Sequence, residues 1–360
     1  MHIEDIIRAA FELGVSDVHI TVNSAPAFRL HGLLIPIDSP ELAGKINIDL
    51  KKLTAEDTKG LARELMSGKQ YEKFLDKGEI DFSCDLPELC RLRVNVYKQR
   101  NYISMAIRLI NSEIPSFEKL GIPEVLISLV RKTRGLVLVT GPTGSGKSTT
   151  LAAMIDLINR EKSCHIITLE DPIEYVHHHK KSVINQREIG IDTETFASAL
   201  RAALREDPDV ILVGEMRDPE TIATAITAAE TGHLVFATLH TSSASQTIDR
   251  IIDVFPPHQQ QQIKIQLANT IQGIIAQQLI PRADKTGRVA AFEILLATPA
   301  IRNLIREGKT YQIISQIQTG SKFGMKTLDA SLSELCRKGL ISKEELLNRA
   351  ADVENMKRLF

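Results

Sequence analysis

The sequence contains no tryptophan, and only 4% of its 360 residues are aromatic. Its charges nearly cancel, because 44 lysines and arginines stand against 45 aspartates and glutamates and leave a formal net charge of −1. Proteins that track single-stranded nucleic acid combine basic grooves with aromatic side chains on which bases stack. The composition therefore argues against a nucleic-acid-binding protein.

Two further absences concern membranes and cysteine chemistry. The chain has no run of about eighteen consecutive apolar residues, the length that a transmembrane helix needs, and its N-terminal segment MHIEDIIRAAFELG lacks the pattern of a secretory signal. The cysteines, at positions 84, 90, 164 and 336, form no C-x-x-C pair, so neither a zinc ribbon nor a disulfide framework is indicated. We expect a cytosolic protein without a transmembrane segment.

The chain is long enough for two domain cores, and its pattern changes character once. The first part contains an apolar-faced helix near the N-terminus, a second helix that opens at Thr54, and strand-like runs that include DVHITV, FRLHGLLIPI, GEIDFSC, RLRVNVYK and YISMAIRLI. Because helices and strands mix without βαβ alternation, residues 1–110 are predicted to form a small α+β domain. The proline-containing segment 111–119 is predicted to be a linker.

Residues 120–360 follow a more regular pattern. Short apolar strands are predicted at 135–140, 165–170, 210–215 and 233–239, with helical stretches between them. Near-continuous apolar runs are typical of parallel strands that helices cover on both faces. The second domain is therefore predicted to be α/β.

The strongest chemical signal is GPTGSGKST, which follows the strand LVLVT and opens the helix STTLAAMIDLINR. Its glycines let successive N–H groups face phosphates, Lys147 can reach the β- and γ-phosphate oxygens, and Ser148 can ligate Mg²⁺. A plain glycine-rich turn is the alternative, but strand, spacing and helix agree on a nucleotide site for ATP. Its predicted residues are Gly141, Pro142, Thr143, Gly144, Ser145, Gly146, Lys147, Ser148 and Thr149.

Glu215 follows the apolar run VILV in the segment DPDVILVGEMRD, and we expect its strand beside the strand of the phosphate-binding loop. There its carboxylate could orient or deprotonate the attacking water. An ordinary strand-end carboxylate paired with Arg217 is the alternative. Gly214 stands where an acid is expected and cannot bind metal, so other acids must serve the γ-phosphate.

The segment HIITLEDPIEYVH supplies acids at the end of a different strand. Glu170 and Asp171 stand where the chain leaves the sheet, and Glu174 follows on the loop. Mg²⁺ keeps much of its hydration shell and tolerates carboxylates one water away. We predict that Ser148 binds the ion directly and that these acids hold its waters, with a solvated acidic loop as the alternative.

Two histidines flank the strand LVFATL, His233 before it and His240 after it. Because the carboxyl ends of parallel strands gather at one edge, only His240 is expected to face the γ-phosphate. A packing role is the alternative for a single histidine at a strand end. The three adjacent histidines at 177–179 lack the spacing of a metal site and are interpreted as solvated surface.

Together, GPTGSGKST, LEDPIEYVH, VILVGEMRD and TGHLVFATLHT resemble the secretion and pilus ATPases of the type II/type IV superfamily. Within that superfamily, AIRNLIREGKTYQI, with GRVAAFE before it, is similar to the type IV pilus retraction motors. The resemblance covers almost the whole chain. It implies a PAS-like N-terminal domain joined to a RecA-like P-loop ATPase domain, assembled as a cytoplasmic homohexamer at the inner face of the cytoplasmic membrane. Its implied partners are the inner-membrane pilus platform protein and the pilin machinery.

The resemblance also implies roles for individual residues. The family's sequence boxes fall on Lys147 and Ser148, on Glu170, Asp171 and Glu174, on Glu215, and on His233 and His240. The family places arginines of the N-terminal domain near the nucleotide, and this sequence offers Arg91, Arg93 and Arg108. Strand alternation lets Arg91 and Arg93 share a face, and solvated strand arginines are the alternative.

One absence separates members of the superfamily. Assembly and secretion ATPases usually carry a tetracysteine zinc insert after the ATPase core, whereas AQQLIPRADKTGRVAAFEI contains no cysteine. Retraction is therefore preferred over pilus assembly or type II secretion. A RecA-like nucleic-acid motor and a scaffold that binds ATP without hydrolysing it remain as alternatives.

The segment TPAIRNLIREGK predicts a short helix over residues 300–307. Thr298 can cap it, Pro299 suits its first position, and Gly308 can end it. Apolar side chains at 301, 304 and 305 should pack inward, and the polar ones at 302, 303, 306 and 307 should lie largely on other faces. In the retraction motors this motif is tied to retraction rather than to the nucleotide.

Overall fold

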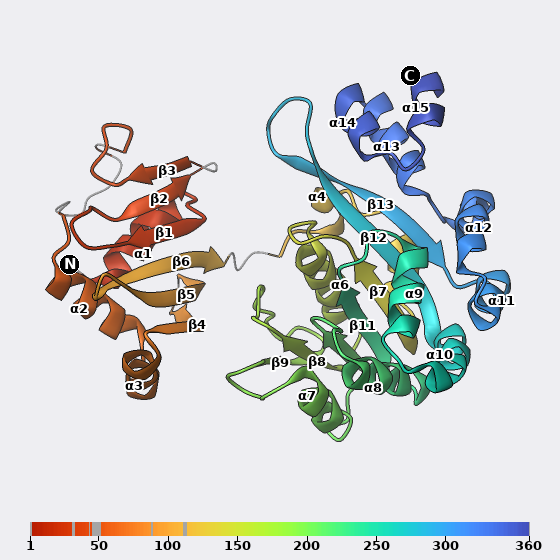
Figure 1. Cartoon of the computed structure of the whole chain (residues 1–360), viewed down its shortest axis with the longest axis horizontal. Coiled ribbons are helices and arrows are strands. Elements are labelled where there is room, and N and C mark those ends of the chain that lie inside the picture. Colours follow the sequence, from red (N-terminus) through yellow and green to blue (C-terminus); the bar gives the residue numbers. More distant parts are fainter. Residues whose placement is uncertain are drawn as a thin grey trace. The chain divides into compact units, whose positions relative to one another are not determined.

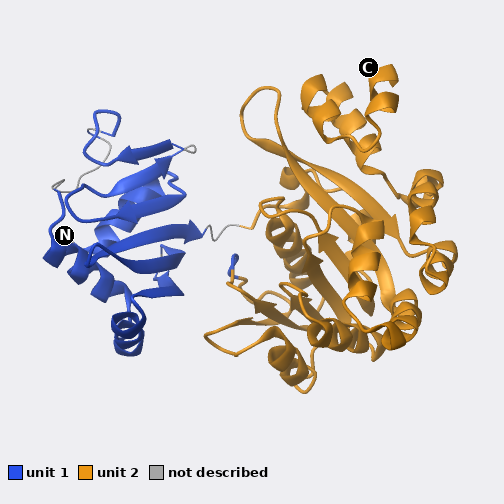
Figure 2. Cartoon of the chain, viewed as in Figure 1, with its two compact units in different colours: residues 1–113, 174–176 blue, residues 114–173, 177–360 orange. Residues whose placement is uncertain are grey.

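The computed structural model describes residues 2–30, 33–42, 44, 52–87, 89–110 and 114–359. The chain divides into two compact units, Met1–Glu113 with Glu174–Val176, and Ile114–Ile173 with His177–Phe360 (Figure 2). Of the predicted linker 111–119, residues 111–113 lie outside the described residues, and Phe117–Leu120 form helix α4.

The N-terminal unit is built on a six-stranded antiparallel sheet in the order β3-β2-β1-β6-β5-β4 (Figure 1). Its strands are β1 (Asp17–Ile20), β2 (Ala27–Leu30), β3 (Leu33–Pro36), β4 (Glu79–Leu86), β5 (Cys90–Gln99) and β6 (Tyr102–Ile110). Its helices are α1 (Ile3–Glu12), α2 (Ala55–Leu65) and α3 (Gly68–Lys77). Alternate side chains of β5 and the apolar face of α1 share one core, as period-2 and period-3.6 patterns require.

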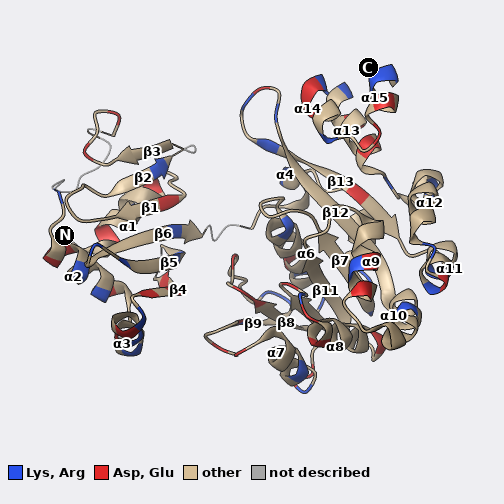
Figure 3. Cartoon of the chain, viewed as in Figure 1, with Lys and Arg blue, Asp and Glu red and all other residues tan. Residues whose placement is uncertain are grey.

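The second unit is built on a seven-stranded sheet in the order β13-β12-β7-β11-β10-β8-β9. β13 runs antiparallel to β12, and the other neighbours pair in parallel. The strands are β7 (Gly135–Thr140), β8 (His165–Glu170), β9 (Val183–Glu188), β10 (Val210–Val213), β11 (Leu234–Leu239), β12 (Ile271–Pro281) and β13 (Arg288–Leu296). In Figure 3, β7, β8 and β11 are mostly tan, since few of their residues carry charge.

Helices cover both faces of this sheet. The helices of this unit after α4 are α5 (Val125–Val130), α6 (Lys147–Glu161), α7 (Phe196–Ala203), α8 (Pro219–Glu230), α9 (Ala244–Asp253), α10 (Pro257–Thr270), α11 (Pro299–Glu307), α12 (Ile313–Thr319), α13 (Leu328–Arg337), α14 (Lys343–Arg349) and α15 (Val353–Leu359), with 3₁₀ turns η1 (Thr310–Gln312) and η2 (Ser321–Phe323). Leu136 and Leu138 of β7 face the core shared with α7 to α12, whereas Val137 and Val139 face the core shared with α5 and α6. The strand is therefore apolar on both faces, as its composition predicts.

Two features of the sheet differ from the sequence-based expectation. β11, rather than β10, lies beside the loop strand β7, so the expectation that the Glu215 strand adjoins the loop strand was wrong. The β12–β13 hairpin was not predicted, although β12 flanks β7 on its other side. Strand order depends on pairing between segments far apart in sequence, which periodicity does not report.

Helix α11 forms where the sequence predicts it. Thr298 accepts a hydrogen bond from the Ile301 N–H, and Gly308 ends the helix in the left-handed conformation. Ile301 and Ile305 are fully buried. Arg302, however, does not lie free on another face: its Nη1 donates to the carbonyl oxygens of Ala268 and Asn269, at the C-terminal end of α10.

The burial of Arg302 lowers its pKa, and the neighbouring Arg306 adds to the effect. A cation at a helix C-terminus satisfies carbonyl groups that have no partner within the helix. Arg302 therefore links α11 to α10 and serves the fold, whereas Arg306 is exposed.

We expect Arg302→Ala to lower the free energy of unfolding by about 1–3 kcal/mol, the range for a hydrogen bond to a charged group. Arg306→Ala is the matched control on the same helix, and its effect should stay within about 0.5 kcal/mol. Denaturant unfolding of both variants measures the difference. Equal stability of the two variants would contradict a capping role for Arg302.

Candidate active site

The parallel pairing gathers the predicted site residues at one edge of the second sheet. The carboxyl ends of β7, β11, β10 and β8 follow one another across the sheet. They lead into the phosphate-binding loop, His240, Glu215 and, at the end of β8 itself, Glu170. Neighbouring strands lie about 4.8 Å apart, so the β10 backbone is about 10 Å from that of β7. His240 thus follows the strand next to the loop.

The phosphate-binding loop spans the turn between β7 and α6. Gly146 caps α6 with φ +87° and Gly141 follows β7 with φ +143°, values that side chains rarely tolerate. The Lys147 ammonium donates to the carbonyl oxygens of Gly141 at 2.8 Å and of Pro142 at 3.1 Å. The lysine is therefore folded over the start of its own loop.

A buried hydroxyl in this loop fits a phosphate group. Ser145 is 3% exposed, and its Oγ is buried without a hydrogen-bond partner within the protein. A buried polar atom without a partner is costly, so such atoms mark positions where a ligand or ion completes the structure. With the amino end of α6 and Lys147 beside it, the loop suits a polyphosphate.

Glu215 is held by two basic side chains. Its Oε1 atom lies 2.5 Å from Arg217 Nε and 3.1 Å from His240 Nε2. Both contacts fall on the same carboxylate oxygen, and the Glu215 side chain is 18% exposed. Glu215 therefore forms the ion pair with Arg217 that the sequence offered as the alternative, and this pair does not exclude a catalytic role.

Burial acts to raise the pKa of Glu215, but the hydrogen bond from Arg217 and the proximity of His240 outweigh it and hold the pKa below its usual value. Glu215 is consequently ionised at neutral pH. An ionised carboxylate at this edge can accept a hydrogen bond from water or take its proton.

Close packing explains the glycine before Glu215. A β-carbon on Gly214 would lie 3.0 Å from the Leu169 carbonyl oxygen and 3.3 Å from the Glu170 Cα. The Gly214 N–H donates to that same carbonyl at 2.7 Å, which joins the end of β10 to the end of β8. Any side chain at this position would require the two strand ends to shift by a few tenths of an ångström, so glycine suits their close contact.

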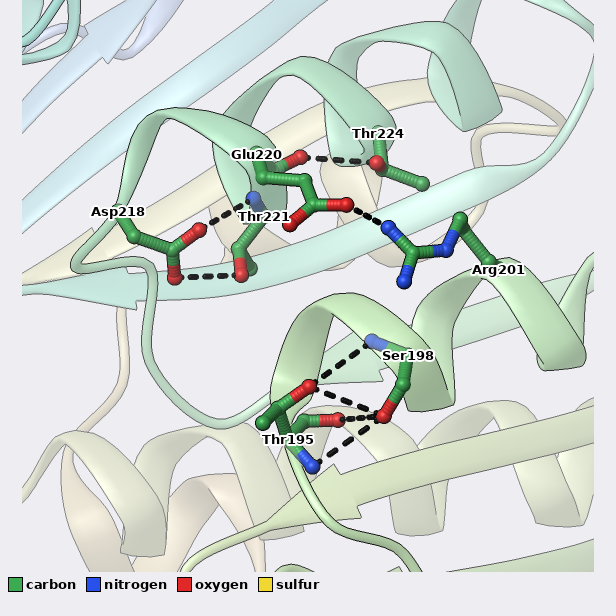
Figure 4. Close-up of polar contacts among 7 residues, drawn as sticks. All are labelled: Thr195, Ser198, Arg201, Asp218, Glu220, Thr221 and Thr224. Atoms are coloured by element: carbon green, nitrogen blue, oxygen red, sulfur yellow. Dashed lines mark hydrogen bonds and ion pairs between the residues drawn. The ribbon is translucent and has the colours of Figure 1, made fainter.

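The segment after Glu215 is anchored by polar contacts on α8 (Figure 4). Asp218 accepts hydrogen bonds from the Thr221 N–H at 2.8 Å and from its hydroxyl at 2.7 Å, which caps the helix. Glu220, in the first turn, pairs with Arg201 of α7. The Asp218 contacts thus cap the amino end of α8, and the Glu220–Arg201 pair links α8 to α7 at the surface.

The acidic segment after β8 is only partly gathered at the loop. Glu170 Oε1 accepts from the Thr168 hydroxyl at 2.6 Å and from Gln186 Nε2 at 3.1 Å, and Gln186 belongs to β9, on the side away from β7. Asp171 is exposed, and Glu174 groups with the N-terminal unit. Within the described ranges, no group of three or more histidine, cysteine, aspartate or glutamate residues could hold a metal ion.

The remaining histidines lie elsewhere. The His233 Nδ1 is 2.9 Å from the Ala228 carbonyl oxygen, at the amino end of β11 and so at the opposite edge from the loop. His233 therefore lies away from Glu215, Arg217 and His240. His177 is buried and burial lowers its pKa to about 4, so its interpretation as solvated surface was wrong, whereas His178 and His179 are exposed as expected.

Arg91 and Arg93 lie on β5, on the face opposite its buried residues, and Arg108 lies on the neighbouring β6. Each pairs with an aspartate of a neighbouring strand: Arg91 with Asp85 at 2.8 Å, Arg93 with Asp81 at 3.1 Å, and Arg108 with Asp17 at 2.9 Å. Arg93 and Arg108 are directly opposite in the β5–β6 register. A cluster of like charges is thus balanced by aspartates.

One residue that contacts the loop was missed by sequence reasoning. Gln277 of β12 is 3% exposed and hydrogen-bonds through its side chain to Ser145 and Thr150. The available signal was a glutamine inside the apolar run IIAQQLI, since a polar residue in a buried strand needs a partner.

Comparison with known proteins identifies the family. Residues 1–348 match the family described as "Type II/IV secretion system protein". The chain belongs to this family. It is 48% identical over 355 residues to a Pseudomonas aeruginosa protein named "Type IV pilus retractation ATPase PilT", with 99% of this chain and 100% of that protein covered.

Further relatives agree with that match. A Neisseria gonorrhoeae protein named "Twitching motility protein" is 49% identical over 331 residues, which cover 92% of this chain and 86% of that protein. The crystal structure of the pilus retraction motor PilT with bound ADP has a TM-score of 0.91 and 49% identity to this chain and covers 99% of both chains. The predicted resemblance to pilus retraction ATPases is confirmed.

The fold class is confirmed as well: a PAS-like N-terminal α+β domain is followed by a RecA-like P-loop ATPase domain. As a member of this family with a complete phosphate-binding loop, the chain binds nucleotide and is an ATPase. None of the helices in the described part of the chain is long and apolar enough to cross a membrane.

The Arg217 contact generates a prediction about pH. Arg217→Ala removes the hydrogen bond that lowers the pKa of Glu215, so this pKa should rise. Hydrolysis that needs ionised Glu215 is lost as the pH falls through this pKa, so the acid limb of the kcat/KM profile should move to higher pH. Arg201→Ala, which removes an exposed arginine from the neighbouring α7, is the control and should leave the limb in place. If the acid limb of the kcat/KM profile of Arg217→Ala coincides with that of the parent chain, Glu215 is not the titrating group.

Proposed function

We propose that this chain is a motor ATPase that uses ATP hydrolysis to retract a type IV pilus, and so drives twitching motility. The observation that carries the proposal is near-full-length identity to the PilT protein of Pseudomonas aeruginosa, combined with the complete phosphate-binding loop. The Glu215–Arg217–His240 cluster adds a carboxylate that is suited to hydrolysis rather than to binding alone.

The loop residues bind the phosphates of ATP. On nucleotide binding, Lys147 exchanges the carbonyl oxygens of Gly141 and Pro142 for β- and γ-phosphate oxygens. Ser148, in the first turn of α6, would hold Mg²⁺, and the acids Glu170, Asp171 and Glu174 are proposed to hold its waters. When bound, the ion neutralises phosphate charge. The hydroxyl of Ser148 and an exposed acidic segment are a donor set suited to this hard cation.

Glu215 orients the attacking water. Arg217 and His240 both contact Oε1, which leaves the other carboxylate oxygen for the water. His240 follows the strand beside the loop strand and is therefore the side chain of this cluster placed to respond to the γ-phosphate. If His240 changed its contact with Glu215 when a γ-phosphate is bound, the pKa of Glu215 would change as well. Binding of the phosphate would then affect the basicity of the carboxylate.

The N-terminal arginines are proposed to supply positive charge to the phosphates. For this, Arg91, Arg93 or Arg108 must exchange its aspartate for a phosphate oxygen. The Arg93–Asp81 pair is exposed on both sides, and such pairs contribute only about 0–1 kcal/mol, so this exchange is inexpensive. We further propose that the chain works as a cytoplasmic homohexamer at the inner face of the membrane, with the pilus platform protein and pilin machinery as partners.

Glu215→Gln tests the chemistry. The amide keeps the size of the side chain but cannot accept a proton, so hydrolysis should fall by about 10²–10⁴ while ATP binding persists. Glu220→Gln, at an exposed acid of the same segment, is the control and should hydrolyse ATP like the parent chain. In cells, Glu215→Gln should leave extended pili that do not retract.

The cellular result separates the alternatives. Loss of pili in cells without this chain would indicate assembly instead of retraction, and unchanged pili with stimulation of hydrolysis by single-stranded DNA would indicate a nucleic-acid motor. Normal hydrolysis by Glu215→Gln would exclude this residue as the base.

Helix α11 provides a probe of coupling between hydrolysis and work. Arg306 is exposed on this helix, and Arg302 is excluded as a probe because it caps α10. We expect Arg306→Glu to keep hydrolysis within about threefold of the parent, as for a substitution outside the site, and to abolish retraction. ATPase rate and twitching motility of the same variant measure this. Normal motility would make Arg306 dispensable, and lost hydrolysis would assign α11 to the active site.

A further inference from the structure

Gln277 contacts the phosphate-binding loop at two points through its side chain. Its Nε2 donates to the Ser145 carbonyl oxygen at 2.8 Å, and its Oε1 accepts from the Thr150 hydroxyl at 2.7 Å. Ser145 lies within the loop, and Thr150 lies in the first turn of α6. Gln277 and Thr150 are both almost fully buried, 3% and 2% exposed. One amide thus spans the loop and the helix that follows it.

The main chain of Gln277 packs against the loop as well. A β-carbon on Gly141 would lie 2.3 Å from the Gln277 carbonyl oxygen, and one on Gly146 would lie 2.9 Å from its Nε2. Any other residue at either glycine would therefore displace Gln277. The first glycine and the glycine before Lys147 are needed for close approach to this strand as well as for their positive φ angles.

The contact with Ser145 determines the direction of an N–H group. The Ser145 carbonyl and the Gly146 N–H belong to one trans peptide, in which the two groups point in opposite directions. A donor that holds the carbonyl toward β12 therefore turns the N–H away from β12. Phosphate-binding loops hold their ligand through such main-chain N–H groups.

The amide of Gln277 is itself held in place. Thr150 donates to Oε1 of Gln277. If the Gln277 amide rotated by half a turn, its Oε1 would face the Ser145 carbonyl oxygen, and two acceptors would meet. A hydrogen-bonded chain of this kind also polarises its members, which strengthens the donor at its end. Donor and acceptor are both required here, and glutamine supplies them on one side chain.

We propose that Gln277 is a positioning residue for nucleotide binding, which directs the Gly146 N–H toward the phosphates through the Ser145–Gly146 peptide. The proposal rests on the assignment of ATP as the ligand of this loop. It adds a part of the site that lies on β12, more than a hundred residues from the loop in the sequence.

The test uses the full-length chain and fluorescent ADP as the probe. Gln277→Leu removes both polar contacts at nearly constant volume, and we expect the Kd for ADP to rise about tenfold, which corresponds to ~1.4 kcal/mol. Gln277→Glu keeps the acceptor but loses the donor to Ser145, and it should weaken binding at least as much. The KM for ATP should rise with little change in kcat, because the contact holds the phosphate in ground and transition states alike.

Gln278→Leu is the matched control, since it makes the same change at the next residue of β12, whose side chain points to the other face. Its Kd should stay within about twofold of the parent, as expected for a site without this contact. A merely structural role would lower the melting temperature of Gln277→Leu without ADP and leave its Kd unchanged, and that result would overturn the proposal.

If the Gln277→Leu variant does not fold, Thr150→Val tests the proposal. It removes the group that orients the amide, so the Kd for ADP should rise about threefold or more, the effect of one lost neutral hydrogen bond. An unchanged Kd would overturn the proposal. Failure of the parent chain to bind ADP would instead defeat the proposed function, so the two failures are distinguishable.

Discussion

Parallel pairing of the strands in the second sheet is the constraint on which the rest of this molecule depends. Main-chain hydrogen bonds place the carboxyl ends of β7, β11, β10 and β8 at one edge, where the phosphate-binding loop, His240, Glu215 and Glu170 stand. Pairing also sets their order, so that His240 stands between the loop and Glu215. Strand spacing of about 4.8 Å then fixes how far each side chain must reach.

Within this frame, the charge of Glu215 is controlled by its neighbours. Gly214 lies in close contact with the end of β8, and Glu215 is the carboxylate that follows it at the end of β10. The hydrogen bond from Arg217 and the proximity of His240 lower the pKa of this carboxylate despite its partial burial, and Asp218 caps the helix that follows. The charge at this position therefore depends on two neighbouring side chains as well as on burial.

The β12–β13 hairpin joins the nucleotide site to the C-terminal helices. Gln277 reaches the loop on one side of the sheet, while Glu293 of β13 accepts a hydrogen bond at 2.7 Å from the Ala244 N–H, at the start of α9 and four residues after His240. Burial raises the pKa of Glu293, although main-chain N–H donors oppose the effect. The same strand pairs through Ile294 with Lys326, just before α13. Two buried polar side chains thus connect the hairpin to the phosphate-binding loop and to the start of α9.

The sequence by itself determined the local elements and the chemistry of the loop. Alternation and apolar runs predict β5, β7 and β8, the spacing of glycine, lysine and serine identifies the phosphate-binding turn, and Thr298 with Gly308 delimits α11. These features depend on residues within a few positions of one another. Tertiary structure decided which strand lies beside the loop, that Arg302 caps α10 instead of facing solvent, that His177 is buried, and that Gln277 supports the Ser145 peptide. Each of these depends on contacts between residues distant in sequence, and the periodicity of one segment carries no information about the segment that it will meet.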